Sequence, residues 1–176
     1  NFFGSSPDTG VFINGSIFLG VLIFSVYGIA KKAYNEKAGL LAAFLVSVYP
    51  IIFGHTRVFM YDLPLTAMVS LSIFAFQNTD NFRIRIGSIF FGATLGLGML
   101  TKWPFPIFVF GALFCYLGKT SVNTMYHAIN DVGGFLSKLR KSQNKIINFS
   151  LAVLIAIVMA STWYEHNIFS LIRILV

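Results

Sequence analysis

From Ala38 to Thr79 the chain reads AGLLAAFLVSVYPIIFGHTRVFMYDLPLTAMVSLSIFAFQNT. Two runs in this stretch, Ala38–Thr56 and Leu63–Thr79, contain no Asp, Glu, Lys or Arg. His55 lies near the end of the first run, and Arg57 and Asp62 lie between the two runs. Each run has about the length that a membrane-spanning helix needs, roughly 17–25 residues. Because the rest of the sequence has so few charges, ionisable side chains at the end of such a helix indicate an interaction partner or a function.

The composition is that of a membrane protein. The chain has 176 residues, of which 56% are hydrophobic and 11% are charged, and its mean hydropathy is +0.77. A typical soluble domain has about 25% charged residues. A soluble chain of this length could not bury so much apolar surface in one core. We therefore predict an all-α membrane protein, built as a bundle of transmembrane helices.

Six uncharged runs predict about six transmembrane helices. The runs cover residues 9–30, 38–56, 63–79, 86–101, 103–118 and 146–164. The first, second and last are close to the ~20 residues that cross a bilayer, and the middle three are at or below that length. Pro104 and Pro106 follow Lys102 closely and favour a break between the fourth and fifth runs.

Small residues predict close helix packing in the fourth run. Gly92 and Gly96 have GxxxG spacing, and Gly87 and Gly98 extend the same small-residue face. Such faces let two helix backbones approach closely in lipid. The pattern predicts a compact bundle and nothing more specific.

The distribution of basic residues predicts the orientation. Alternating six helices across the membrane gathers most of the thirteen Lys and Arg residues on one side: Lys31, Lys32, Lys37, Arg83, Arg85, Lys119, Lys138, Arg140, Lys141 and Lys145. The positive-inside rule places these loops in the cytoplasm. Arg57, Asp62 and Lys102 then face the outside or the lumen. The net charge of +7 therefore reflects topology. Nucleic-acid binding is disfavoured, because the charge is divided among short loops.

The segment 119–145 differs from the other cytoplasmic loops. Apolar residues recur in it at three- and four-residue spacing, with Lys and Arg between them. This pattern predicts an amphipathic helix that lies in the membrane interface and binds anionic head groups. Gly133 and Gly134 are expected to interrupt it. The alternative is a solvated connecting loop.

Three outward residues are candidates for a binding site, and each has a simpler alternative. Asp62 precedes Leu63 and Pro64, so it can be a helix N-cap as well as a substrate ligand. Arg57 offers a planar fork suited to phosphate oxygens, and a loop can place it over the same cavity as Asp62; otherwise it anchors lipid head groups. Lys102 either binds a phosphate or extends its amine to the interface. His55 is interpreted as structural or solvated.

The order of these motifs resembles that of a known enzyme superfamily. Arg57 and Asp62 occur in His-Thr-Arg-x-x-x-x-Asp-x-Pro-Leu, and Lys102 ends Gly-x-Gly-Met-Leu-Thr-Lys. The last apolar run ends in Trp163 and Tyr164. From about residue 3 to 164 the chain is similar to the polyprenyl-phosphate-sugar-dependent glycosyltransferases of the GT-C superfamily. The most similar branch is family 39, with the protein O-mannosyltransferases and the lipid A aminoarabinose transferase.

The resemblance implies a glycosyltransferase that moves a sugar from a polyprenyl-phosphate donor to a lipid, glycan or protein acceptor at the outer or lumenal face. It implies that Arg57 and Lys102 bind the donor phosphate, and that Asp62 is a supporting acidic residue. Trp163 and Tyr164 match the family's aromatic pair and are expected to bind substrate. The chain begins at Asn1 rather than Met, and we expect a partial domain whose catalytic carboxylate lies upstream.

Two other classes of function stay open at this point. A transporter or flippase for an anionic lipid or solute would use the same cations, although charges near the middle of the helices would then be expected. A non-catalytic membrane subunit is the third alternative. No His, Cys and carboxylate set has metal-ligand spacing, so a divalent cation stays an open option beside the lipid-phosphate sugar. A prokaryotic cytoplasmic membrane is favoured over the endoplasmic reticulum.

Overall fold

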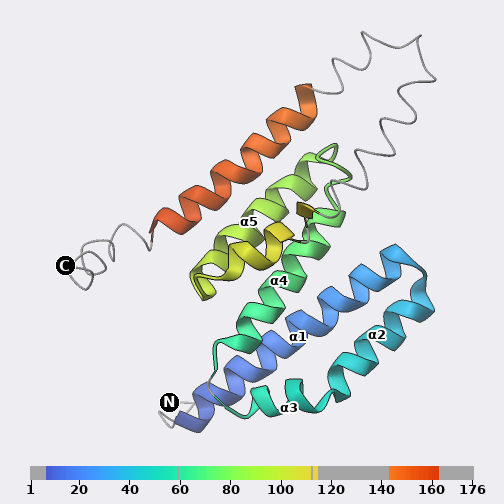
Figure 1. Ribbon diagram of the computed structural model, residues 1–176, viewed down its shortest axis with the longest axis vertical. Helices are drawn as coiled ribbons and strands as arrows, with labels where there is room; N and C mark the ends of the chain where they lie inside the picture. Colours follow the sequence, from blue (N-terminus) through green and yellow to red (C-terminus); the bar gives the residue numbers. More distant parts are fainter. Residues whose placement is uncertain (1–6, 59, 112, 115–142, 163–176) are drawn as a thin grey trace, which may run out of the picture.

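The computed structural model describes residues 7–58, 60–111, 113–114 and 143–162. Its helices are α1 (Pro7–Ala33), α2 (Glu36–Val48), α3 (Pro50–Thr56), α4 (Asp62–Gln77) and α5 (Arg85–Thr101), followed by helical residues 105–111 and the helix Gln143–Thr162. The described residues contain no β-strand, as Figure 1 shows. This confirms the predicted all-α class. Most of the predicted amphipathic segment, residues 119–142, lies outside the described residues.

The lengths of the helices support a membrane protein. Thr9–Ala33 and Gln143–Thr162 are each long and apolar enough to cross a bilayer. The pair α2 and α3 adds a third candidate span if the two count as one. α4 and α5 are apolar but shorter. The integral-membrane class is therefore confirmed, whereas the total of six crossings stays a prediction.

The predicted second span, residues 38–56, is two helices rather than one. α2 and α3 are bent by 58° where they meet. The cause is Pro50: its ring disfavours a helical conformation at the preceding residue, and Tyr49 is extended with φ −69° and ψ 121°. Pro50 then fits the first turn of α3, where no backbone N–H is needed. Because of the bend, α3 crosses the N-terminal part of α1, whereas an unbent helix would continue alongside α1.

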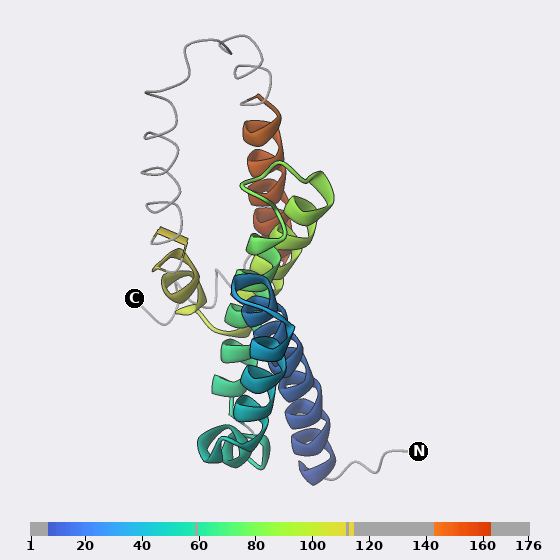
Figure 2. The same cartoon turned by 90° about the vertical axis from the view of Figure 1, so that its right-hand side faces the viewer.

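Figures 1 and 2 show how the helices lie against one another. α1 packs against both α2 and α4, and α4 packs against α5. The helix Gln143–Thr162 runs beside α5 in both views. α3 lies at the same end of the molecule as the start of α1. Helices from the beginning, middle and end of the chain thus share one bundle.

The glycines of α5 account for the packing of the helix Gln143–Thr162. A Cβ placed on Gly92 would lie 2.5 Å from the backbone oxygen of Ala152, and one on Gly96 would lie 2.6 Å from Cβ of Met159. Only residues without a side chain allow this approach. The packing role predicted for this GxxxG motif is confirmed.

Two apolar clusters hold the ends of the helices that carry the candidate residues. Leu63 and Ala67 of α4 pack with Leu22 of α1. Deeper in α4, Leu65 and Met68 pack with Phe105 and Val109, which follow the α5 C-cap residue Lys102. The start of α4 and the segment after α5 are therefore fixed relative to each other.

The turn between α4 and α5 has an unusual backbone. Asp80, Asn81 and Phe82 have φ values of 47°, 55° and 61°, in the left-handed region that non-glycine residues seldom occupy. Tertiary contacts hold the turn. Phe82 is buried among aromatic rings, and its carbonyl accepts a hydrogen bond of 2.8 Å from the Nδ2 atom of Asn148, which is also buried. The helix Gln143–Thr162 thus stabilises the turn that precedes α5.

Candidate functional site

Asp62 and Lys102 form an ion pair. Asp62 is the first residue of α4, and Lys102 is the C-cap of α5, with extended backbone dihedrals of φ −160° and ψ 140°. The Nζ atom of Lys102 lies 2.7 Å from Oδ1 of Asp62. Their side chains are 39% and 52% exposed, so water reaches both. Residues forty positions apart in the chain are brought together, as their predicted sidedness implies.

The ion pair lowers the pKa of Asp62. The hydrogen bond from Lys102 is the main cause, and the charge of Lys102 is the second. Partial desolvation acts in the opposite direction, and the charge of His55 adds a small lowering effect. The carboxylate of Asp62, which stands just before the predicted span 63–79, is therefore ionised at neutral pH.

Asp62 is not a helix N-cap, contrary to one of the two roles the sequence allows. Tyr61 occupies that position, and its own side chain makes no capping hydrogen bond to α4. Asp62 lies one residue later, in the first turn, where its charge interacts favourably with the helix dipole. Its carboxylate points instead to the end of α5. Helix capping therefore does not explain the position of Asp62, and its role in a binding site stays a prediction.

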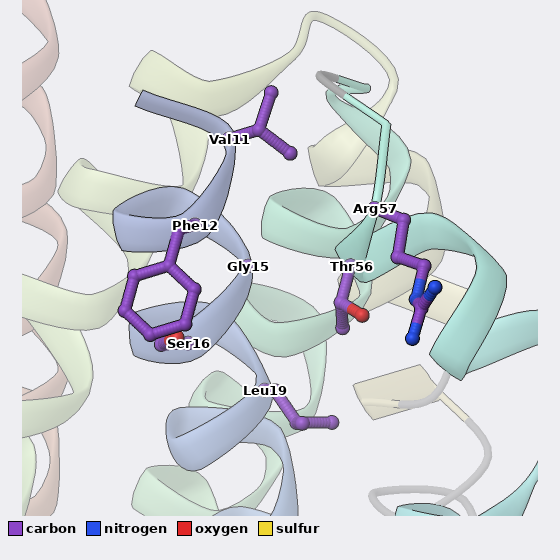
Figure 3. A pocket seen from close by; sticks show the side chains of 7 residues that line it. All are labelled: Val11, Phe12, Gly15, Ser16, Leu19, Thr56 and Arg57. Atoms are coloured by element: carbon purple, nitrogen blue, oxygen red, sulfur yellow. The ribbon is translucent and has the colours of Figure 1, made fainter. Parts of the chain in front are cut away.

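Arg57 faces a different pocket from Asp62, although the sequence suggested one shared cavity. It lies just after α3, and its guanidinium lies 4.7 Å from the centre of the Phe53 ring. With Thr56 it lines one wall of a pocket of ≈ 470 Å³, as Figure 3 shows. The opposite wall is the start of α1, with Val11 and Leu19 among its lining residues.

A close contact between α1 and α3 explains the position of Arg57. A Cβ placed on Gly15 would lie 2.6 Å from the backbone oxygen of Thr56, and Gly15 itself is buried. Gly10 and Gly20, on the same helix, have no heavy atom within 4 Å of such a Cβ. Gly15 therefore lets the end of α3 lie directly on α1, which brings the backbone of Arg57, the residue after α3, beside α1 at this pocket.

His55 lines a second pocket together with Asp62. This pocket has a volume of ≈ 240 Å³, and its remaining lining residues are Leu22, Tyr49, Ile51, Ile52, Leu63 and Thr66. The sequence alone suggests a structural or solvated role for His55; in the structure it is half-buried and lines this pocket beside the ionised carboxylate. The signal in the sequence is the three-residue spacing of Ile52 and His55, which places both on one face of a helix that begins at Pro50.

The remaining predicted residues are not placed. Trp163 and Tyr164 lie outside the described residues. Within the part of the chain that the structure describes, no group of three or more His, Cys, Asp or Glu side chains could hold a metal ion. An apolar pocket of ≈ 270 Å³ lies between α5, residues 105–113 and the helix Gln143–Thr162. It contains no candidate polar residue.

Comparison with known proteins assigns a family to most of the chain. A family model described as dolichyl-phosphate-mannose-protein mannosyltransferase matches residues 1–136. The match includes His55, Arg57, Asp62 and Lys102, and with them both polar pockets. No curated protein and no solved structure matches the chain.

Proposed function

This chain belongs to the dolichyl-phosphate-mannose-protein mannosyltransferase family, and from that premise we propose that it transfers a sugar from a polyprenyl-phosphate donor to a hydroxyl-bearing acceptor. The family supports a membrane glycosyltransferase of the mannosyltransferase type. The proposal adds the donor chemistry, an outward or lumenal site and a lipid, glycan or protein acceptor. We place it in a prokaryotic cytoplasmic membrane, with the endoplasmic reticulum as the alternative.

The observation that carries the proposal is the ion pair of Asp62 and Lys102 at the ends of α4 and α5. In transfer from a lipid-phosphate sugar, the bond from the sugar to phosphate oxygen breaks, and negative charge develops on the leaving phosphate. A fixed ammonium group stabilises that charge without having to reorganise. Asp62 fixes the ammonium group of Lys102 in position, so we assign Lys102 to the leaving phosphate and Asp62 to positioning it.

The same geometry argues against Asp62 as the general base. A base must accept the proton of the acceptor hydroxyl, and a carboxylate whose pKa is lowered by a lysine is a weaker proton acceptor. This agrees with the supporting role that the resemblance implies for Asp62.

Arg57 receives a separate assignment, because it lines the pocket between α1 and α3. Its exposed guanidinium suits a phosphate group that arrives from the membrane surface. We propose that Arg57 captures the lipid phosphate and that Lys102 makes the contact during transfer. Trp163 and Tyr164 are retained as proposed substrate contacts from the family resemblance.

The test is sugar transfer by the full-length protein in lipid nanodiscs, with radiolabelled polyprenyl-phosphate mannose as donor. We expect Lys102→Ala to lower kcat by roughly 10²–10³-fold, the cost of removing one preorganised donor to a developing charge. Asp62→Asn leaves Lys102 without its fixed partner, and misplacement of this kind costs about 10²-fold.

Lys37→Ala is the matched control, because Lys37 is an exposed lysine in a predicted cytoplasmic loop. Its turnover should equal that of the wild type. An inactive wild-type protein would contradict the proposed reaction. An active wild type with unchanged Asp62→Asn and Lys102→Ala variants would contradict the site instead.

A further inference from the structure

We infer that the pocket shared by His55 and Asp62 holds the sugar ring of the donor, and that His55 and Thr66 bind its hydroxyl groups. This inference rests on the proposed function and deepens it, because it names the part of the substrate that this pocket takes. It also gives a role to His55, which the ion pair and the arginine pocket do not involve.

The pocket has the mixed lining that a sugar ring requires. Its polar side chains are Tyr49, His55, Asp62 and Thr66, and its apolar ones are Leu22, Ile51, Ile52 and Leu63. A sugar ring has hydroxyl groups around its rim and C–H groups on its two faces. Small-molecule sites typically combine an apolar lining with a few placed polar groups of this kind.

The hydrogen-bonding groups in the pocket favour a neutral polyol over an anion. Oδ1 of Asp62 accepts from Lys102, and a carboxylate has further lone pairs that accept from hydroxyl groups. The hydroxyl of Thr66 donates to the backbone oxygen of Asp62 over 2.8 Å, so its remaining capacity is to accept. A phosphate in this pocket would meet the negative charge of Asp62. The hydroxyl groups of a sugar would instead donate hydrogen bonds to the oxygens of Asp62 and Thr66.

The ion pair sets the distance between the two parts of the donor. In a glycosyl phosphate, a phosphate oxygen is bonded directly to the ring. Lys102 lies 2.7 Å from the carboxylate that lines the pocket. When the phosphate binds Lys102, the attached sugar ring therefore lies beside Asp62. Arg57 lines the other pocket and therefore does not compete for this space.

The size of the pocket limits its occupant. Its volume of ≈ 240 Å³ lies below the range of about 300–1,000 Å³ that is usual for drug-sized ligands. One sugar ring is of this scale, whereas a polyprenyl chain or an extended glycan is larger. The lipid chain of the donor is therefore expected to lie outside this pocket.

The experiment compares the binding of two lipids to the full-length protein in nanodiscs. One is polyprenyl-phosphate mannose, and the other is the same polyprenyl phosphate without a sugar. His55→Ala should lower the affinity for the sugar-bearing lipid by about 3- to 10-fold, the usual effect of one lost hydrogen bond. The affinity for the polyprenyl phosphate without a sugar should stay unchanged. Thr66→Val keeps the side-chain shape, removes the hydroxyl and should act in the same direction.

Ser47→Ala is the control. Its hydroxyl donates to the carbonyl of Phe44 over 2.7 Å, on α2, and it does not line the pocket. If His55→Ala and Thr66→Val lowered the affinity for both lipids equally, the inference would be overturned, because those residues would then act on the phosphate or on the fold. Unchanged donor binding, with or without a raised acceptor KM, would overturn it as well. A wild type that binds the donor but never transfers its sugar contradicts the proposed function rather than this pocket.

Discussion

At the scale of single residues, Asp62 connects the polar features of this site. Its carboxylate accepts the hydrogen bond of Lys102 and lines the pocket that also contains His55. Loss of its charge would therefore affect the end of α5 and the pocket at the same time. The exposure of both partners limits the energy of the pair, because solvent screens charges that it can reach.

The pKa of Asp62 predicts how the stability of this pair depends on pH. The folded-state pKa lies below the ordinary value of 3.8, so the unfolded chain binds the proton more readily. The stabilising contribution is present in full well above pH 3.8 and is lost as the pH falls from there through the lowered folded pKa.

We therefore expect the melting temperature of Asp62→Asn to be below that of the wild type at pH 7 and to approach it as the pH falls below 3.8. Melting of both proteins in detergent between pH 3 and pH 7 measures this. A difference that persists unchanged at pH 3 would show that the substitution acts through something other than charge.

The sequence predicts some of this site and not the rest. Asp62 and Lys102 each stand at a boundary between apolar runs on the same predicted side, and they are neighbours in the structure. The shared cavity that the sequence allows for Arg57 and Asp62 does not appear in the two described polar pockets, because each residue lines a different one. The position of Arg57 depends on where Pro50 restarts the helix and on the contact of Thr56 with Gly15 of α1. That tertiary contact cannot be predicted from the spacing of residues 55–62.

At the scale of the elements, the short helix α3 determines how the polar residues are divided. The 58° bend before it carries the chain across α1. One side of α3 presents Arg57 to the pocket with α1, and the other presents His55 to the pocket with α4. Among the described residues, α3 thus borders both polar pockets.

The contact of Gly15 with α3 gives a prediction for this element. Gly15→Ala places a methyl group against the backbone of Thr56, and overpacking of this kind typically costs about 1–3 kcal/mol. We expect a lower melting temperature and weaker binding of polyprenyl phosphate, because α3 and Arg57 must move.

Gly20→Ala is the matched control on the same helix. A Cβ there meets no heavy atom within 4 Å, and alanine is favoured over glycine in a helix by up to about 1 kcal/mol. It should be neutral or stabilising. Equal effects of the two substitutions would show that the α1–α3 contact is unimportant.

The elements themselves were partly predictable. The boundaries of α5 follow from an uncharged run between Arg85 and Lys102. The turn before it was not predictable, because three left-handed residues that include Phe82 depend on burial and on a hydrogen bond from Asn148, far along the chain. Local propensity disfavours such a turn, and tertiary contacts hold it in place.

At the scale of the whole molecule, the polar groups separate to the two ends of the bundle. At one end, Lys32 near the end of α1 donates to the side chain of Asn78 over 3.1 Å and to the backbone oxygen of Gln77. At the other end lie Arg57, Asp62 and Lys102, where α3 ends, α4 starts and α5 ends. This arrangement agrees with the basic loops and the site residues being on opposite sides of a membrane.

Cysteine labelling tests the predicted orientation of the full-length protein. A Cys115→Ser background removes the one cysteine of this chain, and any other cysteine of the full-length protein is replaced as well. A single cysteine is then placed at Lys37 or at Val58, which are both exposed. We expect an impermeant maleimide added to intact cells to label the Val58→Cys variant and to spare the Lys37→Cys variant.

Lysed cells provide the control, because both variants should react once the membrane is open. Labelling of Lys37→Cys in intact cells, with protection of Val58→Cys, would reverse the orientation and place the site in the cytoplasm. The positive-inside rule would then fail for this protein.

The glycine face of α5 also bears on how the protein is made. Gly92 and Gly96 are covered by the helix Gln143–Thr162, which follows α5 in the chain and is therefore synthesised after it. Until then α5 presents its groove of small residues to lipid, and its lasting partner is absent. A chain truncated before residue 143 would therefore retain an uncovered docking face, which makes it a target for membrane quality control during biogenesis.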